Sequence, residues 1–113
     1  MINTKINILG TEYEIITQSE NDNPKLKENN GLCECFSKKI VLNDMEWTKE
    51  EVMAFENIDE LKKKVLRHEI IHAFFTESGL MNNSDYAENE ELVDWIAIQS
   101  PKFFKVFEKL GVL

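Results

Sequence analysis

The stretch His68-Glu69-Ile70-Ile71-His72 reads as H-E-x-x-H and lies within a pattern that predicts a helix from Asp59 to Ser78. Residues four apart project from one side of an α-helix, so both imidazoles can reach a single metal ion. Neutral imidazole is a good zinc ligand, and Glu69 can act as a general base on a metal-bound water. Because two histidines and a glutamate also meet by chance, the rest of the chain must supply further ligands.

Length and composition predict one soluble domain. The chain has 113 residues, of which 42% are hydrophobic, enough for a modest single core. Its formal charge of −8 argues against nucleic acid as a partner, because phosphate backbones would be repelled. No leader-like start is present, and no apolar run approaches the roughly 20 residues that span a bilayer. We therefore expect a cytoplasmic monomer that binds neither nucleic acid nor a membrane.

Residues that favour β-structure cluster in four runs before residue 44, which predicts two hairpins and a small antiparallel sheet of about four strands. A polar stretch, residues 19–30, separates the hairpins and predicts a surface loop. The predicted strands are Lys5 to Leu9, Glu12 to Thr17, Leu32 to Phe36 and Lys39 to Asn43. The apolar face is expected to contain Ile6, Ile8, Ile15, Ile40 and Leu42.

Capping patterns place the helices. Asn57 and Glu60 predict the start of the main helix, and Gly79 predicts its end. Thr48 and Glu51 form a similar pattern, which predicts a short connecting helix. The expected organisation is a single α+β domain over residues 1–113: a sheet region at 1–43, the H-E-x-x-H helix at 57–79, and a second helix at 86–99. Ser100-Pro101 predicts an N-cap and first turn, so a separate short helix is expected at 101–110.

Cys33 and Cys35 are the only cysteines. One residue apart on a strand, they would share a face, and a strain-free disulfide between them is not expected. They do not form a usual C-x-x-C zinc motif. We interpret them as two reduced, half-buried thiols.

The two histidines of the motif are the only histidines in the chain. A single histidine on an apolar helix face is more often a hydrogen-bonded core residue than a ligand. Here two histidines and Glu69 share one turn among apolar neighbours, and burying all three unpaired would cost several kcal/mol. A bound metal ion removes that difficulty.

A hydrolytic zinc site usually has three protein ligands, so a third is needed. The metzincin extension fails, because Phe75 stands where its glycine belongs and Ser78 where its third histidine belongs. The alternative, a glutamate followed one turn later by an aspartate, is matched by Glu90 and Asp94. Asp94 would accept the outer N–H of a ligand histidine and so fix its tautomer.

Through these two stretches the chain resembles the gluzincin metallopeptidases, and in size and layout their small members called minigluzincins. It is also similar to small phage- or prophage-encoded metallopeptidase-like proteins. The resemblance implies a Zn²⁺ cofactor held by His68, His72 and Glu90, with Glu69 as general base and acid and Asp94 behind the ligands. It implies a peptide or protein substrate and hydrolysis of peptide bonds.

Larger gluzincins add a tyrosine or histidine that stabilises the oxyanion. This chain has no further histidine, and Tyr86 is the one candidate donor near the site, although it equally fits a packed aromatic at a helix start. By analogy of layout, the strand Ile40 to Asn43 is expected to offer a free edge to an extended peptide.

Three other interpretations stay open. The chain could be a zinc-binding regulatory or interaction protein with little or no activity, favoured by its small size and missing oxyanion donor. It could be an α+β domain without a metal. It could also be latent, with the apolar segment from Phe103 to Leu113 lying over the cleft.

Overall fold

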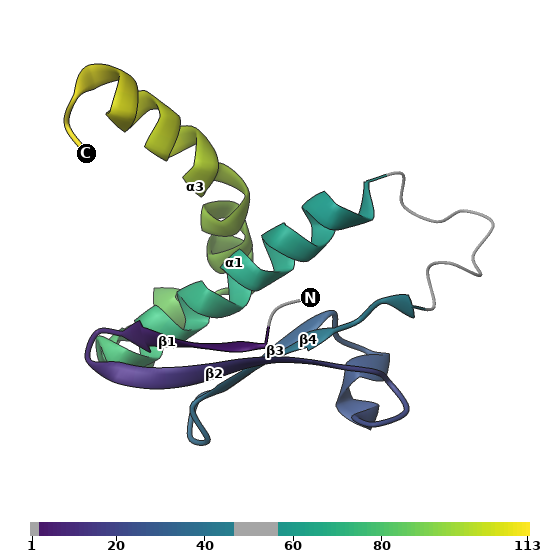
Figure 1. Cartoon of the computed structure of the whole chain (residues 1–113). Coiled ribbons are helices and arrows are strands. Elements are labelled where there is room, and N and C mark those ends of the chain that lie inside the picture. Colours follow the sequence, from purple (N-terminus) through teal and green to yellow (C-terminus); the bar gives the residue numbers. More distant parts are fainter. Residues whose placement is uncertain (1–2, 47–56) are drawn as a thin grey trace.

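The computed structural model describes residues 3–46 and 57–113, and it has the expected α+β class (Figure 1). A sheet region comes first and the helices follow it. The strands are β1 (Thr4–Ile8), β2 (Thr11–Gln18), β3 (Gly31–Glu34) and β4 (Lys39–Asn43), with a 3₁₀ turn, η1 (Pro24–Lys27), between β2 and β3. The helices are α1 (Ile58–Glu77), the one-turn α2 (Leu80–Asn83) and α3 (Glu90–Leu110), with the 3₁₀ turn η3 (Asp85–Glu88) before α3.

The sheet is mixed, which corrects the expectation of purely antiparallel pairing. Its strand order is β1-β2-β4-β3. The two predicted hairpins are present, but β2 pairs with β4 in parallel, with Ile15 opposite Ile40. A parallel pair needs a crossover of a dozen or more residues, and the loop together with β3 provides it. Consequently β4 has a neighbour on each side, and the free edges belong to β1 and β3.

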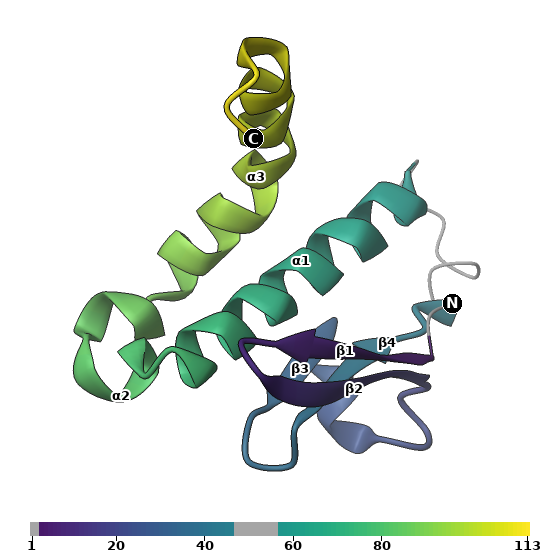
Figure 2. The same cartoon turned by 60° about the vertical axis from the view of Figure 1, so that its left-hand side comes forward.

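Helix α1 lies across one face of the sheet (Figures 1 and 2). The buried cluster between them comprises Ile8, Tyr13, Ile15, Ile40 and Ala73, with Cys33, Leu42, Leu66 and Ile70 packed against it. Four of the five predicted apolar positions are therefore in or against the core. The fifth, Ile6, is 39% exposed, although Ile8 on the same strand is fully buried.

The ends of α1 are those that the capping residues predict. The Asn57 side chain accepts a hydrogen bond from the Glu60 backbone N–H at 3.4 Å. Gly79 adopts the left-handed conformation, with φ of 84°, directly after the helix. The short helix predicted around Thr48 and Glu51 lies outside the described residues.

The predicted helix start at residue 86 is wrong, because residues 85–88 form the turn η3 and α3 begins at Glu90. Asn89 sets this start: its side chain accepts a hydrogen bond from the Leu92 backbone N–H at 2.8 Å. The N-cap at Asn89, three residues after the predicted start, thus overrides the apolar periodicity that begins at residue 86.

The predicted helix break at Ser100-Pro101 is also wrong, since α3 runs without interruption through Pro101 to Leu110. Proline has no N–H, so the carbonyl of Ala97, four residues earlier, loses its helical donor. The Arg67 side chain replaces it: its Nε donates to the Ala97 carbonyl oxygen at 2.6 Å. This contact between α1 and α3 removes much of the cost of a proline inside the helix.

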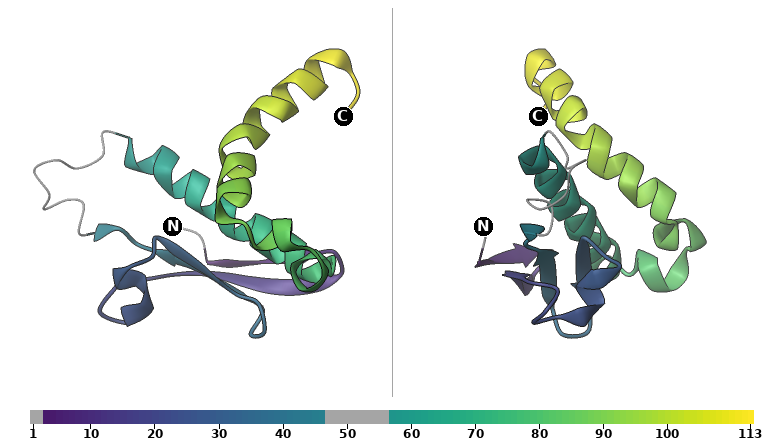
Figure 3. Two further views of the ribbon diagram at one scale, coloured as in Figure 1. Left: turned by 180° about the vertical axis from the view of Figure 1, so that it is seen from behind. Right: turned by 90° about the vertical axis from the view of Figure 1, so that its right-hand side faces the viewer.

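Beyond Pro101, α3 extends away from the sheet and α1 (Figures 1 and 3), and its residues from Lys102 onward are exposed. Although α3 has 21 residues, neither it nor another helix in the described part of the chain is apolar enough to cross a bilayer.

Glu77, in the last turn of α1, joins the helix to the sheet. Its Oε2 accepts hydrogen bonds from the Tyr13 hydroxyl at 2.7 Å and from Lys38 Nζ at 2.9 Å. Hydrogen bonds from Thr11, Tyr13 and Lys38 lower the pKa of Glu77 to about 2. A carboxyl group whose pKa is depressed on folding stabilises the fold above its unfolded pKa and ceases to do so as pH falls through the folded pKa.

We therefore predict that Glu77→Gln lowers the free energy of unfolding by about 1–3 kcal/mol at pH 7, and that the difference shrinks from about pH 4.5 towards pH 2. Urea unfolding across this pH range measures it. The matched control is Glu12→Gln, which removes an exposed ion pair with Lys5 at 3.8 Å and should change stability by less than about 0.5 kcal/mol. A Glu77→Gln effect that is independent of pH would contradict the role of the carboxylate charge.

Candidate metal centre

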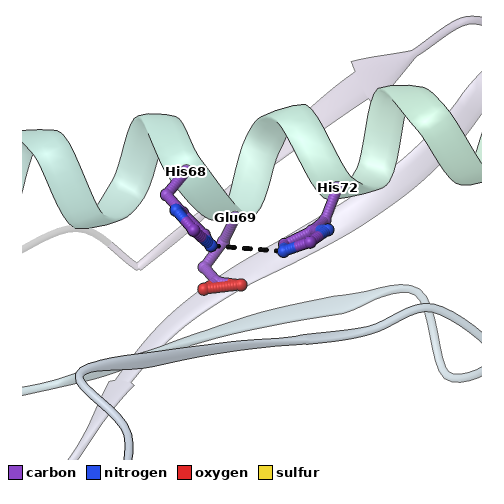
Figure 4. A group of neighbouring side chains, drawn as sticks. All are labelled: His68, Glu69 and His72. Atoms are coloured by element: carbon purple, nitrogen blue, oxygen red, sulfur yellow. Dashed lines mark hydrogen bonds between the residues drawn. The ribbon is translucent and has the colours of Figure 1, made fainter. Parts of the chain in front are cut away.

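Helix α1 places both motif histidines on one face, as the four-residue spacing predicts. Figure 4 shows His68, Glu69 and His72 projecting from α1 on the side of the sheet. The Nε2 atoms of the two histidines lie 3.2 Å apart. One ligand atom from each of the three residues falls within 4.8 Å of the others, so this group could hold a metal ion.

Helix α3 returns alongside α1 and brings Glu90 to the same point. Its Oε2 lies 2.9 Å from His68 Nε2, and its Oε1 lies 3.0 Å from His72 Nε2. One carboxylate therefore contacts both imidazoles. The Glu90 side chain is 69% exposed, so its other surface faces solvent.

Asp94 lies behind His68, one turn along α3 from Glu90. Its Oδ1 is 3.1 Å from His68 Nδ1 and also 3.1 Å from Lys64 Nζ. An ionised carboxylate can only accept, so the hydrogen bond to Asp94 places a proton on His68 Nδ1. In the neutral ring, His68 Nε2 then carries a lone pair directed at Glu90 and His72.

The three groups that meet here, the His68 and His72 imidazoles and the Glu90 carboxylate, offer mainly hydrogen-bond acceptors to one another. If His68 is protonated on Nδ1, its Nε2 accepts only, and so do both Glu90 oxygens. A single proton on His72 Nε2 cannot serve every close contact among these atoms. A cation at their common point would be attracted to all three, so the donor set fits a metal ion.

Glu69 is 6% exposed and packs beneath the histidines. Burial raises its pKa, the His68 charge lowers it and the Glu90 charge raises it, giving a pKa of about 7. A carboxyl group with such a pKa can both take up and release a proton near neutral pH. This is the property that general acid–base chemistry requires.

The other two acid–base groups are held in the states that a metal site uses. Burial lowers the pKa of His72, and the opposing Glu90 charge does not compensate fully, so the imidazole stays neutral. Burial raises the pKa of Asp94, but hydrogen bonds from Lys64 and His68 outweigh this and hold it below its ordinary value. Neutral imidazole and ionised aspartate are the ligand and acceptor forms.

These residues line a cavity of about 480 Å³ between α1, α3 and the edge strand β3. Lys64, His68, His72, Glu90 and Asp94 form its helical wall together with Val65 and Glu69. The opposite wall runs from Glu28 to Cys33 and includes Cys35. Because β3 is an edge strand, the edge beside the motif is that of β3 and not, as expected, that of the strand Ile40 to Asn43.

The structure brings together five of the six predicted site residues. Tyr86 is the exception: it lies in η3, is 51% exposed and is not among the residues that line the cavity. The C-terminal segment from Phe103 to Leu113 does not line the cavity either, so it does not cover the site in this structure.

Lys64 and the loop residues Asn29 and Asn30 are cavity residues that the sequence interpretation missed. The position of Lys64 could have been predicted, because it precedes His68 by four residues and therefore lies on the same helix face. The positions of the two asparagines could not have been predicted, since they depend on how the loop before β3 folds back towards α1.

The two cysteines lie closer than strand geometry predicts. Cys35 follows β3 and belongs to the turn, and its Sγ lies 3.3 Å from Cys33 Sγ. Both are free thiols, and Cys35 Sγ accepts a hydrogen bond from the Thr76 hydroxyl at 3.0 Å. Burial, followed by the neighbouring Cys35, raises the pKa of Cys33, so its thiol stays protonated.

Gly31, the first residue of β3, allows the strand to approach Glu69 closely. A Cβ at this position would lie 2.8 Å from Val65 Cγ1 and 3.1 Å from Glu69 Cγ. Valine is stiff at χ1, so the clash must be relieved by moving the strand or the helix. We predict that Gly31→Ala lowers the free energy of unfolding by about 1–3 kcal/mol. Chemical denaturation measures it, and unchanged stability would show that β3 has room to move.

Comparisons of this chain with protein-family models, with curated proteins and with solved structures find no match.

Proposed function

We propose that this chain is a zinc-dependent metallopeptidase of the gluzincin kind. The observation that carries the proposal is the convergence of His68, His72 and Glu90: two imidazole nitrogens 3.2 Å apart and one carboxylate within 3.0 Å of each. Two ligand atoms on a tetrahedral zinc lie about 3.3 Å apart, given bonds of about 2.0–2.1 Å. The spacing of the three groups fits that ion with little rearrangement.

When bound, zinc would act as a Lewis acid on the scissile carbonyl and lower the pKa of a coordinated water. The chain's own residues account for the remaining roles. Glu69, buried with a pKa of about 7, would take the water proton and return it to the leaving amine. Asp94 would keep His68 in the tautomer that presents Nε2, and Lys64 would hold Asp94 in place.

The substrate would be a peptide in extended conformation. Gly31, Leu32 and Cys33 of β3 line the cavity, and β3 is an edge strand. An extended segment can add to such an edge by backbone hydrogen bonds, which would align its peptide bonds past His68 and His72. Among the described residues, the lining is rich in acids and contains a single lysine, Lys64, which disfavours strongly acidic substrates.

A second candidate function is a zinc-binding regulatory or interaction protein with weak or no peptidase activity. The exposed position of Tyr86 favours it, because no tyrosine lines the cavity among the described residues. Loss of one oxyanion donor typically costs a factor of about 10²–10³ in kcat.

A broad peptide library and an unfolded protein test the proposal with zinc-loaded full-length chain. We expect cleavage that stops with a chelator and returns with zinc. A chain that binds zinc stoichiometrically but cleaves no substrate would favour the regulatory function. Cleavage that is insensitive to a chelator would contradict both.

A further inference from the structure

Helix α3 packs against α1 and η3 near its start, but much of its remaining surface is both exposed and apolar. Trp95 is 51% exposed, Val106 is 54% exposed and Leu110 is 67% exposed. Monomeric soluble proteins rarely leave a long contiguous apolar strip in water. This strip lies outside the candidate metal centre, because none of its residues lines the cavity.

Four exposed apolar residues, Trp95, Phe103, Val106 and Leu110, lie along one side of the helix, with the half-buried Leu92 and Gln99 in line with them. At about 100° per residue, six positions with spacings of 3, 4, 4, 3 and 4 fall within an arc of about 80°. We name this line the α3 seam; it consists of Leu92, Trp95, Gln99, Phe103, Val106 and Leu110. Such spacing is typical of helices that pair along their length. From Leu92 to Leu110 the α3 seam is about 27 Å long.

The α3 seam points away from the candidate metal centre. Glu90 lies roughly 180° around the helix from the middle of the seam, and Asp94 lies about 140° from it. Val93 and Ala97, which are fully buried, are also off the seam. A partner on the seam would therefore leave the cavity between α1 and β3 open.

We propose that the α3 seam binds the α3 seam of a second copy of this chain, in antiparallel orientation. In a two-fold interface, if residue i contacts j then j also contacts i. The seam meets this condition because its positions are nearly symmetric about Pro101. Pairing about that point places Leu92 against Leu110, Trp95 against Val106, and Gln99 against Phe103, each pair occurring twice.

Charges beside the seam favour the antiparallel arrangement. Glu91 flanks the seam near the start of α3 and Lys109 flanks it on the same side near the end. In the antiparallel pair, Glu91 of one copy lies beside Lys109 of the other, and the pair occurs twice. A parallel pair would instead leave Glu91 and Lys109 about 27 Å apart along the helix axes, so this attraction would be lost.

A second copy also fits better than an anionic membrane. The C-terminal part of α3 contains Lys102, Lys105 and Lys109, but the whole chain has a formal charge of −8 and Glu91 borders the seam. An anionic bilayer would repel the acidic chain as a whole and the start of the seam at Glu91. The proposal replaces the monomer expected from composition, which contains no information on which apolar residues stay exposed.

Molecular mass in solution tests the proposal on the full chain. We expect light scattering during gel filtration to give twice the 13.2 kDa of one chain at micromolar concentration. Val106→Glu, in the seam, should raise the dimer dissociation constant about 100-fold or more, because it places two charges in an apolar contact. Phe104→Glu is the matched control: Phe104 is 52% exposed but lies about 140° from the centre of the seam, so dimerisation should persist.

A charge exchange tests the antiparallel register. Glu91→Lys and Lys109→Glu should each raise the dissociation constant about 10-fold, and the double variant should return to the wild-type value. Circular dichroism checks that every variant keeps its helix content.

Three results would overturn the proposal. The first is a wild-type chain that stays monomeric at about 100 μM. The second is an equal loss of association in Val106→Glu and Phe104→Glu, which would indicate unspecific apolar contact. The third is a monomer that sediments with phosphatidylserine vesicles, which would assign the seam to a membrane.

Discussion

Replacing Glu69 by glutamine is expected to lower kcat for peptide hydrolysis about 10³-fold while the zinc content stays at the wild-type level. Glutamine has the same shape as glutamate but cannot take a proton. A Glu69 carboxylate oxygen lies within 4.8 Å of the imidazole ligand atoms, but the contacts of 2.9–3.2 Å join His68 Nε2, His72 Nε2 and the Glu90 carboxylate. This variant should therefore lose activity while it keeps its zinc.

Steady-state kinetics of the zinc-loaded protein, with zinc measured on the same sample, provides the readout. Glu88→Gln is the matched control, because Glu88 is exposed in η3 and does not line the cavity. Its kcat should equal that of the wild type. Turnover by Glu69→Gln within a few-fold of wild type would show that another group accepts the proton.

Replacing His72 by alanine is expected to weaken zinc binding by a factor of about 10³ or more, because it removes one of three ligands. A competition titration against a chromophoric chelator measures this. Asp94→Asn provides a comparison with a smaller expected effect. Asp94 contacts His68 Nδ1 and not the side of the ring that faces His72 and Glu90, so its loss should weaken zinc binding about 10–100-fold.

The order of these two effects distinguishes ligand from supporting residue. If Asp94→Asn weakened binding more than His72→Ala, Asp94 itself would be the ligand and the assignment of roles would be wrong. If neither variant changed the affinity, zinc would bind elsewhere on the chain.

Local sequence patterns predict those features of the fold that depend on nearby residues. The common face of His68 and His72 follows from helix geometry alone, and the ends of α1 follow from Asn57 and Gly79. Glu90 and Asp94 could be selected because their four-residue spacing suits one ligand and one supporting acceptor. Their meeting with the histidines then required only that α3 return alongside α1.

The features that the sequence did not predict depend on contacts between distant residues. The parallel pairing of β2 with β4 is decided by where β3 and β4 dock as a hairpin, which no local pattern encodes. Helix α3 continues through Pro101 because Arg67, on another helix, supplies the missing donor. The exposure of Tyr86 likewise depends on Asn89, which starts α3 later than the apolar periodicity predicts.

Elemental analysis of the full-length protein tests most directly whether His68, His72 and Glu90 form one metal site. For wild-type chain purified without chelator, or incubated with equimolar zinc and desalted, we predict about one zinc per chain. The His68→Ala/His72→Ala double variant, treated identically, should retain less than about a tenth of that amount. Wild-type protein that retains no zinc after incubation, or a double variant that retains as much as wild type, would contradict the account.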